Sequence, residues 1–291
     1  MTEDGWRERW EQVAYHASLG VRVEGVDRDR ARLRVPYKDE NSNPGRVLHG
    51  GVAASTIGIA GALAAWSGVE PRPDLESGTV DLSVNYLAAA VGEDIVATAD
   101  VLRRGKELTY SEVDVRTDAG KRIAIGLVTY RIFDRAANPA AAQRQRATSV
   151  TRAAVGDVIK GAKGFTMLPF MSRLGIVIEH AAEGRSSLRM AHQTALADAA
   201  GGLHEGALAA LVDTSGALAA WSITGLDFSY KASTVGIHVN YHAGAAGEDV
   251  VAQAHTLRRN NEIFLNQVAV SGRSSHTVVA AGTVTYRIVV D

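Results

Sequence analysis

The chain has 291 residues, of which 46% are hydrophobic and 22% are charged, and its formal net charge is −1. This is the composition of an ordinary globular protein, and the near-neutral balance excludes a global basic field that would draw the chain to nucleic acid or to an anionic membrane. The absence of cysteine excludes disulfides, thiolate catalysis and Cys-ligated zinc.

The first third of the chain predicts a helix, strands and a second, longer helix. Residues 4–17 have the spacing of an amphipathic helix, and their charged start lacks the apolar core of a secretion signal, so we expect a cytoplasmic protein. Strands are predicted near 21–26 and 31–35, followed by a turn-rich loop over 37–48. A long apolar helix, rich in glycine and alanine, is predicted over 50–67.

Four further strands follow this helix. They are predicted over 78–87, 93–103, 108–117 and 122–133. One long helix beside many strands is an α+β layout. Because the helix is apolar nearly all round, it must be covered on most sides, as a curved antiparallel sheet wrapped around it would do.

The same order of elements occurs twice. The run Gly61–Trp66 returns 155 residues later as Gly216–Trp221, and the second copy begins near Leu174. A duplication of this length predicts two structural units. We assign residues 1–134 to an N-terminal unit, 135–165 to a linker with a short helix near 150–162, and 166–291 to a C-terminal unit.

The two apolar helices raise the question of membrane insertion. The segment 50–69 is uncharged and long enough to span a bilayer. It contains few large apolar residues, however, and its counterpart at 206–226 has Asp213 in its middle, which is costly in lipid. We therefore expect two helices buried in protein and no membrane partner.

Asp213 is the most informative single residue, because an acid in an apolar helix must be paired, protonated or functional. One alternative is a buried carboxylate satisfied by the neighbouring hydroxyls of Thr214 or Ser215.

His204 lies nine residues before Asp213, which places the two side chains on opposite sides of one helix. A site that uses both residue types must therefore combine the two copies. Two helices packed about a pseudo-two-fold axis would pair His49 with Asp213, and His204 with position 58, which is glycine.

The run Asn43–Gly51, which ends in His-Gly-Gly, resembles the corresponding segment of hotdog-fold acyl-CoA thioesterases of the PaaI-like branch. Leu211–Thr214 resembles their helical L-x-D segment, and residues 80–86 and 109–115 resemble their later strands. The resemblance implies a double hotdog, in which each unit is a long helix wrapped by a curved antiparallel sheet and the two units form a pseudo-dimer.

In that family the site lies between two units. By position, the resemblance implies one complete site, made of Asn43, His49, Gly50, Asp213 and Thr234. It implies a degenerate second site, made of Asp198, His204, Glu205, Gly58 and Thr79, in which three positions depart from the pattern.

The residue types of the complete site suit thioester hydrolysis. The backbone N–H of Gly50 at the helix start can stabilise an oxyanion. Asp213 would activate water as a general base or attack the carbonyl directly. Thr234 would orient the water, Asn43 would hold the water or the carbonyl, and His49 would position the loop.

The expected substrate is an acyl-CoA, with no other cofactor and no metal. Coenzyme A is a polyanion, so basic side chains are expected at the entrance. The candidates are Arg103, Arg104, Lys106, Arg258 and Arg259, and the alternative for them is a solvated turn between strands.

Two other functions stay open: a hotdog enoyl-CoA hydratase or dehydratase, and a non-catalytic acyl-CoA-binding protein. The sequence also leaves open the acyl group, the role of Asp213 as base or nucleophile, the activity of the second site and assembly into a homo-oligomer.

Overall fold

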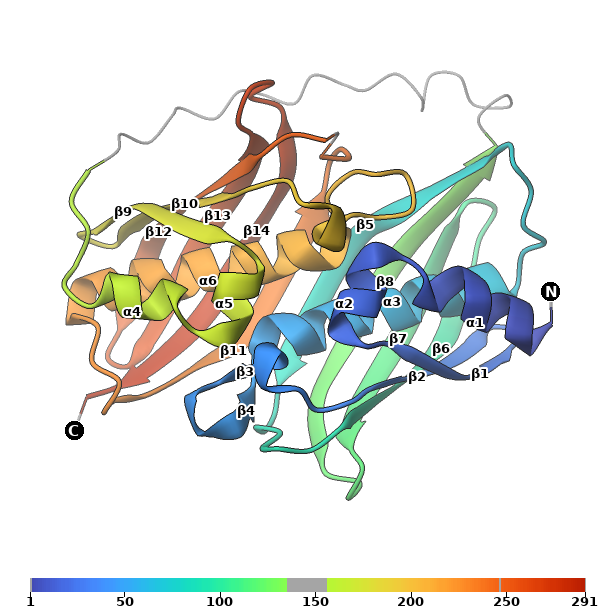
Figure 1. Cartoon of the computed structure of the whole chain (residues 1–291), viewed down its shortest axis with the longest axis horizontal. Coiled ribbons are helices and arrows are strands. Elements are labelled where there is room, and N and C mark those ends of the chain that lie inside the picture. Colours follow the sequence, from blue (N-terminus) through green and yellow to red (C-terminus); the bar gives the residue numbers. More distant parts are fainter. Residues whose placement is uncertain (1, 135–155, 246, 291) are drawn as a thin grey trace.

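A computed structural model describes residues 2–134, 156–245 and 247–290 (Figure 1). The N-terminal unit contains three helices, α1 (Glu3–Glu11), α2 (Ala14–Leu19) and α3 (Gly50–Ser67). Its strands are β1 (Arg22–Asp27), β2 (Arg30–Val35), β5 (Leu75–Tyr86), β6 (Ile95–Arg104), β7 (Leu108–Thr117) and β8 (Arg122–Asp134).

The prediction of one helix over 4–17 was wrong, because the segment forms two. α1 ends at Glu11, and Val13 has φ −59° and ψ 126°, which lies outside the helical region. The break lets Trp6 and Trp10 of α1 and Tyr15 of α2 all become buried. The predicted loop over 37–48 contains two short 3-10 turns and a small hairpin of β3 (Ser42–Asn43) and β4 (Val47–Leu48).

The C-terminal unit repeats this plan. Its helices are α5 (Pro169–Arg173) and α6 (Glu205–Thr224), and they are preceded by α4 (Ala162–Thr166), which begins within the predicted linker. Its strands are β9 (Ile176–Ala182), β10 (Arg185–Met190), β11 (Lys231–Tyr241), β12 (Val250–Asn260), β13 (Ile263–Gly272) and β14 (Val278–Val289). Residues 150–155 of the helix predicted near 150–162 lie outside the described residues. The prediction was wrong for 156–161, which are not helical, and the chain becomes helical only at Ala162.

The two units share one antiparallel sheet. Its twelve strands run in the order β1-β2-β6-β7-β8-β5-β11-β14-β13-β12-β10-β9, so the order in one unit mirrors that in the other. The units join where β5 pairs with β11, from Gly236 opposite Asn85 to Asn240 opposite Asp81. The register of β5 shifts between Thr79 and Asp81, and that of β11 shifts between Thr234 and Gly236, so matching irregularities flank this seam.

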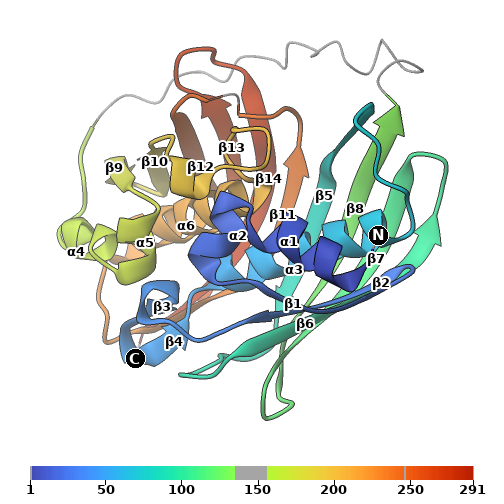
Figure 2. The ribbon, with the colours of Figure 1, turned by 45° about the vertical axis from the view of Figure 1, so that its right-hand side comes forward.

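Helices α3 and α6 lie side by side against the sheet, which curves around them (Figures 1 and 2). Small residues let them approach closely: a Cβ added to Gly51 would lie 2.6 Å from the Cβ of Ala210, and one added to Gly206 would lie 2.9 Å from the Cβ of Ser55. The glycine and alanine content therefore sets the spacing of the two helices.

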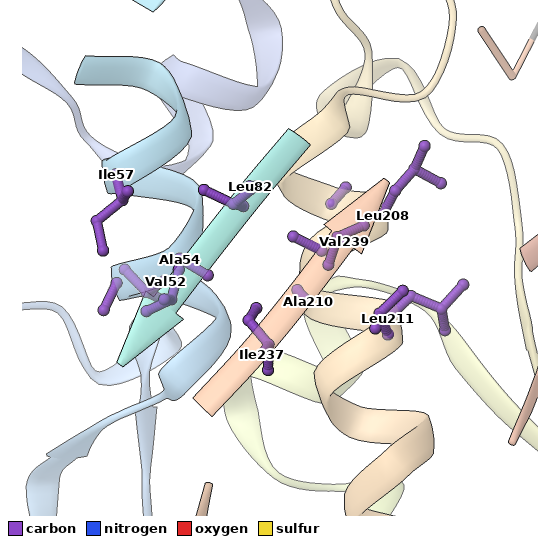
Figure 3. Packing of buried hydrophobic residues seen from close by; sticks show 14 of the residues in the cluster. Val52, Ala54, Ile57, Leu82, Leu208, Ala210, Leu211, Ile237 and Val239 are labelled. Carbon is purple, nitrogen blue, oxygen red and sulfur yellow. The ribbon is translucent and has the colours of Figure 1, made fainter. Parts of the chain in front are cut away.

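The core between the helices and the seam is apolar. Val52 of α3 and Leu82 of β5 lie beside Ile237 and Val239 of β11 in Figure 3, and all four are at most 3% exposed. Hydropathy and length alone would allow α3 and α6 to cross a membrane, but 78% and 89% of their apolar windows are buried inside the protein. This is the pattern of core helices, and it confirms the expected α+β double hotdog.

Candidate active site

The complete site predicted from the sequence is called site one here, and its centre is the start of α3. His49 is the N-cap residue, with φ −67° and ψ 137°, and its Nδ1 accepts a hydrogen bond of 2.9 Å from the backbone N–H of Gly51. Gly50 is the first helical residue, so its N–H has no partner within the helix. That N–H lies at the positive end of the helix dipole and suits a developing negative charge.

Asp213 faces Gly50 from the other unit. Its Oδ2 lies 3.0 Å from the place where a Cβ on Gly50 would be, so a side chain at position 50 would press on the carboxylate. Its Oδ1 accepts a hydrogen bond of 2.6 Å from the Thr234 hydroxyl of β11. Three predicted residues from three different elements thus meet at one point.

The environment of Asp213 raises the pKa of its carboxyl to about 6, because burial disfavours the charged form more than the Thr234 hydroxyl favours it. The alternative, in which the hydroxyl of Thr214 or Ser215 satisfies this acid, was wrong. Thr214 donates to Met171 Sδ at 3.5 Å, and Ser215 donates to Leu211 O at 2.7 Å. The acid is therefore held by a residue of the sheet, and within 2–134, 156–245 and 247–290 its Oδ2 accepts no hydrogen bond and faces Gly50.

His49 is neutral in the working pH range. Burial and the positive charge of Arg173 lower its pKa to about 3. Since Nδ1 accepts from Gly51, the proton of the neutral ring is on Nε2, which can donate a hydrogen bond. The ring stacks on Phe170 of α5 at a centroid distance of 4.5 Å. These properties suit a positioning donor and not a general base.

Sequence reasoning missed three neighbours of site one. The Tyr86 hydroxyl donates to Gly50 O at 3.0 Å, and its ring would lie 3.5 Å from a Cβ on Gly50. Phe170 supports the His49 ring, and Arg173 is the charged group behind it. The repeat of Tyr86 at Tyr241 could have indicated the first, whereas Arg173 aligns with Ser18 and leaves no trace in the repeat.

Arg173 also fixes the loop before α3. Its Nη1 donates to Asn41 Oδ1 at 2.6 Å and to Ser18 O at 3.1 Å. Asn41 O in turn accepts a hydrogen bond of 3.0 Å from the His49 N–H. Asn43 is different: it lies half-buried in β3, and among the described residues its amide has no hydrogen bond to Asp213 or Gly50.

The second predicted set, called site two, has the same frame with different side chains. His204 caps α6 as His49 caps α3, and its Nδ1 accepts from the Gly206 N–H at 2.9 Å. Glu205 stands where site one has Gly50. Its carboxylate reaches Thr79 of β5 and accepts hydrogen bonds from the Thr79 N–H at 2.8 Å and the Thr79 hydroxyl at 2.5 Å.

The other two members of site two are equally distinct. A Cβ added to Gly58 would meet nothing within 4 Å, so the place of the missing acid is open. Asp198 accepts from the N–H groups of Ala200 at 2.8 Å and Gly202 at 2.9 Å, which closes its own turn.

The structure places Arg104, one of the predicted basic residues, away from site one. Arg104 lies at the far end of α3, where it contacts Ala64 O at 3.4 Å and binds Asp29 through Nε at 2.9 Å. At 1.5 Å per residue, Ala64 is about 21 Å along the helix from Gly50. The other four side chains are exposed on β6, on β12 or in the turn after β6: Arg103, Lys106, Arg258 and Arg259.

Two histidine-capped helices that cross inside one curved antiparallel sheet, with a carboxylate of one facing the start of the other, define a double hotdog protein. A sequence model of the thioesterase superfamily matches residues 45–124 and again residues 200–279. The chain belongs to this superfamily, once in each unit.

Individual relatives agree with this assignment. A Halobacterium salinarum protein whose esterase assignment is provisional is 37% identical over 124 residues, which is 40% of this chain and 82% of that protein. The medium/long-chain acyl-CoA thioesterase YigI of Escherichia coli is 28% identical over 135 residues, which is 41% of this chain and 86% of the relative.

Solved structures match the whole chain. A hotdog-fold protein of Alicyclobacillus acidocaldarius has a TM-score of 0.66 and 18% identity, covering 96% of this chain and 98% of its own. An acyl-CoA thioesterase II of Mycobacterium marinum has a TM-score of 0.65 and 15% identity, covering 92% of this chain and 96% of its own. At such identities these two matches establish the fold alone.

Proposed function

We propose that this protein hydrolyses an acyl-CoA thioester to a carboxylic acid and free coenzyme A, and that site one performs the reaction. The observation that carries the proposal is the buried Asp213 carboxylate, which Thr234 holds beside Gly50, the first residue of the helix in the other unit. Relatives described as acyl-CoA thioesterases supply the substrate class.

The geometry suggests an order of events. The thioester carbonyl oxygen accepts from the Gly50 N–H, at the helix end that favours negative charge. The Nε2–H of His49, the N-cap residue before Gly50, would be a second donor. Because glycine has no side chain, the acyl group can approach the backbone closely.

Asp213 acts on water as the general base. Thr234 holds Oδ1, so Oδ2 is left to take a proton from a water molecule. The water oxygen bonds to the carbonyl carbon, the carbon–sulfur bond breaks, and the proton passes from Asp213 to the departing thiolate. A carboxyl with a pKa of about 6 is ionised at neutral pH and still a useful proton acceptor.

The test is release of free thiol from a panel of acyl-CoAs, with Asp213→Asn compared with Asp198→Asn. Asp198 is a matched control, because an asparagine there can still accept from Ala200 and Gly202. We expect loss of hydrolysis in the first variant only. Near-wild-type activity of Asp213→Asn would refute the role of site one, and hydration of an enoyl-CoA without thiol release would replace hydrolysis by a hydratase activity.

One turnover in ¹⁸O-labelled water separates the two chemical roles of Asp213. With enzyme in excess, a general base puts the label directly into the product acid. A nucleophile forms an anhydride, and when water opens it at the Asp213 carbonyl the label enters the Asp213 carboxylate. Mass spectrometry of the peptide would find it there, and label at Asp213 would identify the nucleophile.

A further inference from the structure

Sites one and two contain the same two residue types, a glycine and an acid, in exchanged positions. In site one the helix starts with Gly50 and the acid, Asp213, comes from the facing helix. In site two the helix starts with the acid, Glu205, and the facing position is Gly58. Each carboxylate accepts a hydrogen bond from the threonine hydroxyl at the matching irregularity of its seam strand.

We propose that the Glu205 side chain closes site two by filling the place of the acyl thioester, so that the chain binds one acyl-CoA, and that replacing Glu205 by glycine opens a second acyl-CoA site. This rests on the proposed function of site one, from which the position of the thioester is taken.

The first argument is occupancy and charge. In site one a Cβ on Gly50 would lie 3.0 Å from Asp213 Oδ2 and 3.5 Å from the Tyr86 ring, so the absence of a side chain keeps the helix start open to the thioester of the proposed reaction. In site two the Glu205 side chain starts from that point and runs to Thr79, which it holds through two hydrogen bonds. A carboxylate there also opposes an oxyanion electrostatically, whereas a catalytic site needs donors aimed at that charge.

The second argument is independent of Glu205 and concerns His204. His16 Nδ1 lies 2.8 Å from Trp10 O, a carbonyl that can only accept, so this nitrogen carries the proton of His16. The Nε2 of His16 is then the acceptor for the Nε2–H of His204, at 2.9 Å. The Nε2–H of His49 has no hydrogen-bond partner in the part of the chain that the structure describes, whereas that of His204 is taken by His16. In site one the residue aligned with His16 is Met171, which has no ring nitrogen.

The third argument is that the backbone frame of site two is intact. His204 caps its helix as His49 does, and Tyr241 donates to Glu205 O at 3.0 Å as Tyr86 donates to Gly50 O. Gly58 is half-buried with open space beside it. Shortening residue 205 therefore leaves a site with room and with a helix N–H directed into it.

The experiment measures binding stoichiometry by calorimetry with a non-hydrolysable thioether analogue of the best acyl-CoA substrate. We expect one molecule per chain in the wild type and two in Glu205→Gly. Glu205→Gln is the matched control, because glutamine keeps the length of the side chain and an oxygen that can accept from Thr79, and it should stay at one.

A transfer of the side chain tests the same idea from the other direction. Gly50→Glu should bind none, because the new side chain would meet Asp213 Oδ2, and the double variant Gly50→Glu/Glu205→Gly should bind one, at site two. Two bound molecules per chain in the wild type would overturn the proposal. So would one bound molecule in Glu205→Gly, provided that this variant unfolds cooperatively near the wild-type temperature. If Glu205→Gly does not fold, Glu205→Ala serves with the same expectation. A wild type that binds none would instead refute the proposed function.

Discussion

Replacing Asp213 by asparagine should lower activity and raise stability at the same time. Asparagine has nearly the shape of aspartate, and its side-chain oxygen can still accept from the Thr234 hydroxyl. Removal of a general base typically lowers kcat by about 10²–10⁴-fold. The free energy of unfolding should rise because Asp213 is only 3% exposed, and asparagine at this position buries no charge.

The size of the gain follows from the pKa of Asp213. Folding raises that pKa from 3.8 to about 6, which is about two pH units. At about 1.4 kcal/mol per unit, the ionised acid lowers the free energy of unfolding by about 3 kcal/mol. The sign fixes the window: the penalty is absent below pH 3.8, grows as pH rises, and is complete above about pH 6.

Thermal unfolding of both proteins at several pH values tests this reasoning. At roughly 2 °C per kcal/mol in a chain of this size, the variant should unfold about 6 °C higher at pH 8, and the difference should shrink towards pH 4. Asp198→Asn should show no such pH-dependent difference. If Asp213→Asn loses activity but is no more stable than the wild type at pH 8, ionisation of Asp213 does not lower the free energy of unfolding.

The same contacts lead to further expected outcomes. The wild-type kcat/KM should fall as pH drops below about 6, because the base becomes protonated. Thr234→Val removes the hydroxyl that lowers the pKa of Asp213, so this acid limb should move to higher pH, whereas Thr79→Val should leave it in place. Gly51→Ala would put a Cβ 2.6 Å from a carbon of the facing helix and should destabilise the fold by about 1–3 kcal/mol in chemical denaturation. Gly58→Ala meets nothing within 4 Å and should stabilise it by about 0.5–1 kcal/mol, and equal effects at the two glycines would contradict the helix spacing described above.

Much of the fold could be predicted because the signals are local and occur twice. The predicted helix over 50–67 matches α3, since its apolar run begins directly after the N-cap His49 and ends before Gly68. The break at Val13 could not be predicted, because no proline or glycine marks it. It depends on how the tryptophans of α1 and Tyr15 of α2 become buried, which is a tertiary effect.

The candidate site, too, could be predicted only in part from the sequence. Helix periodicity indicated that a histidine acting with Asp213 must come from the other unit and pointed to His49. The structure places Gly50, the residue after His49, opposite Asp213. Glu205 could be seen only as the loss of a glycine, because its reach to Thr79 depends on the distance between α6 and β5. Arg173 was invisible for a similar reason: it meets Asn41 through contact between the two units.

The seam between β5 and β11 has a consequence for how such a molecule can change. In a symmetric dimer of identical chains every substitution appears in both sites, so loss of the acid would silence both at once. Here both halves of the sheet belong to one polypeptide, and a substitution appears once. Gly58 and Glu205 could therefore arise at one site while Asp213 and Gly50 stayed at the other.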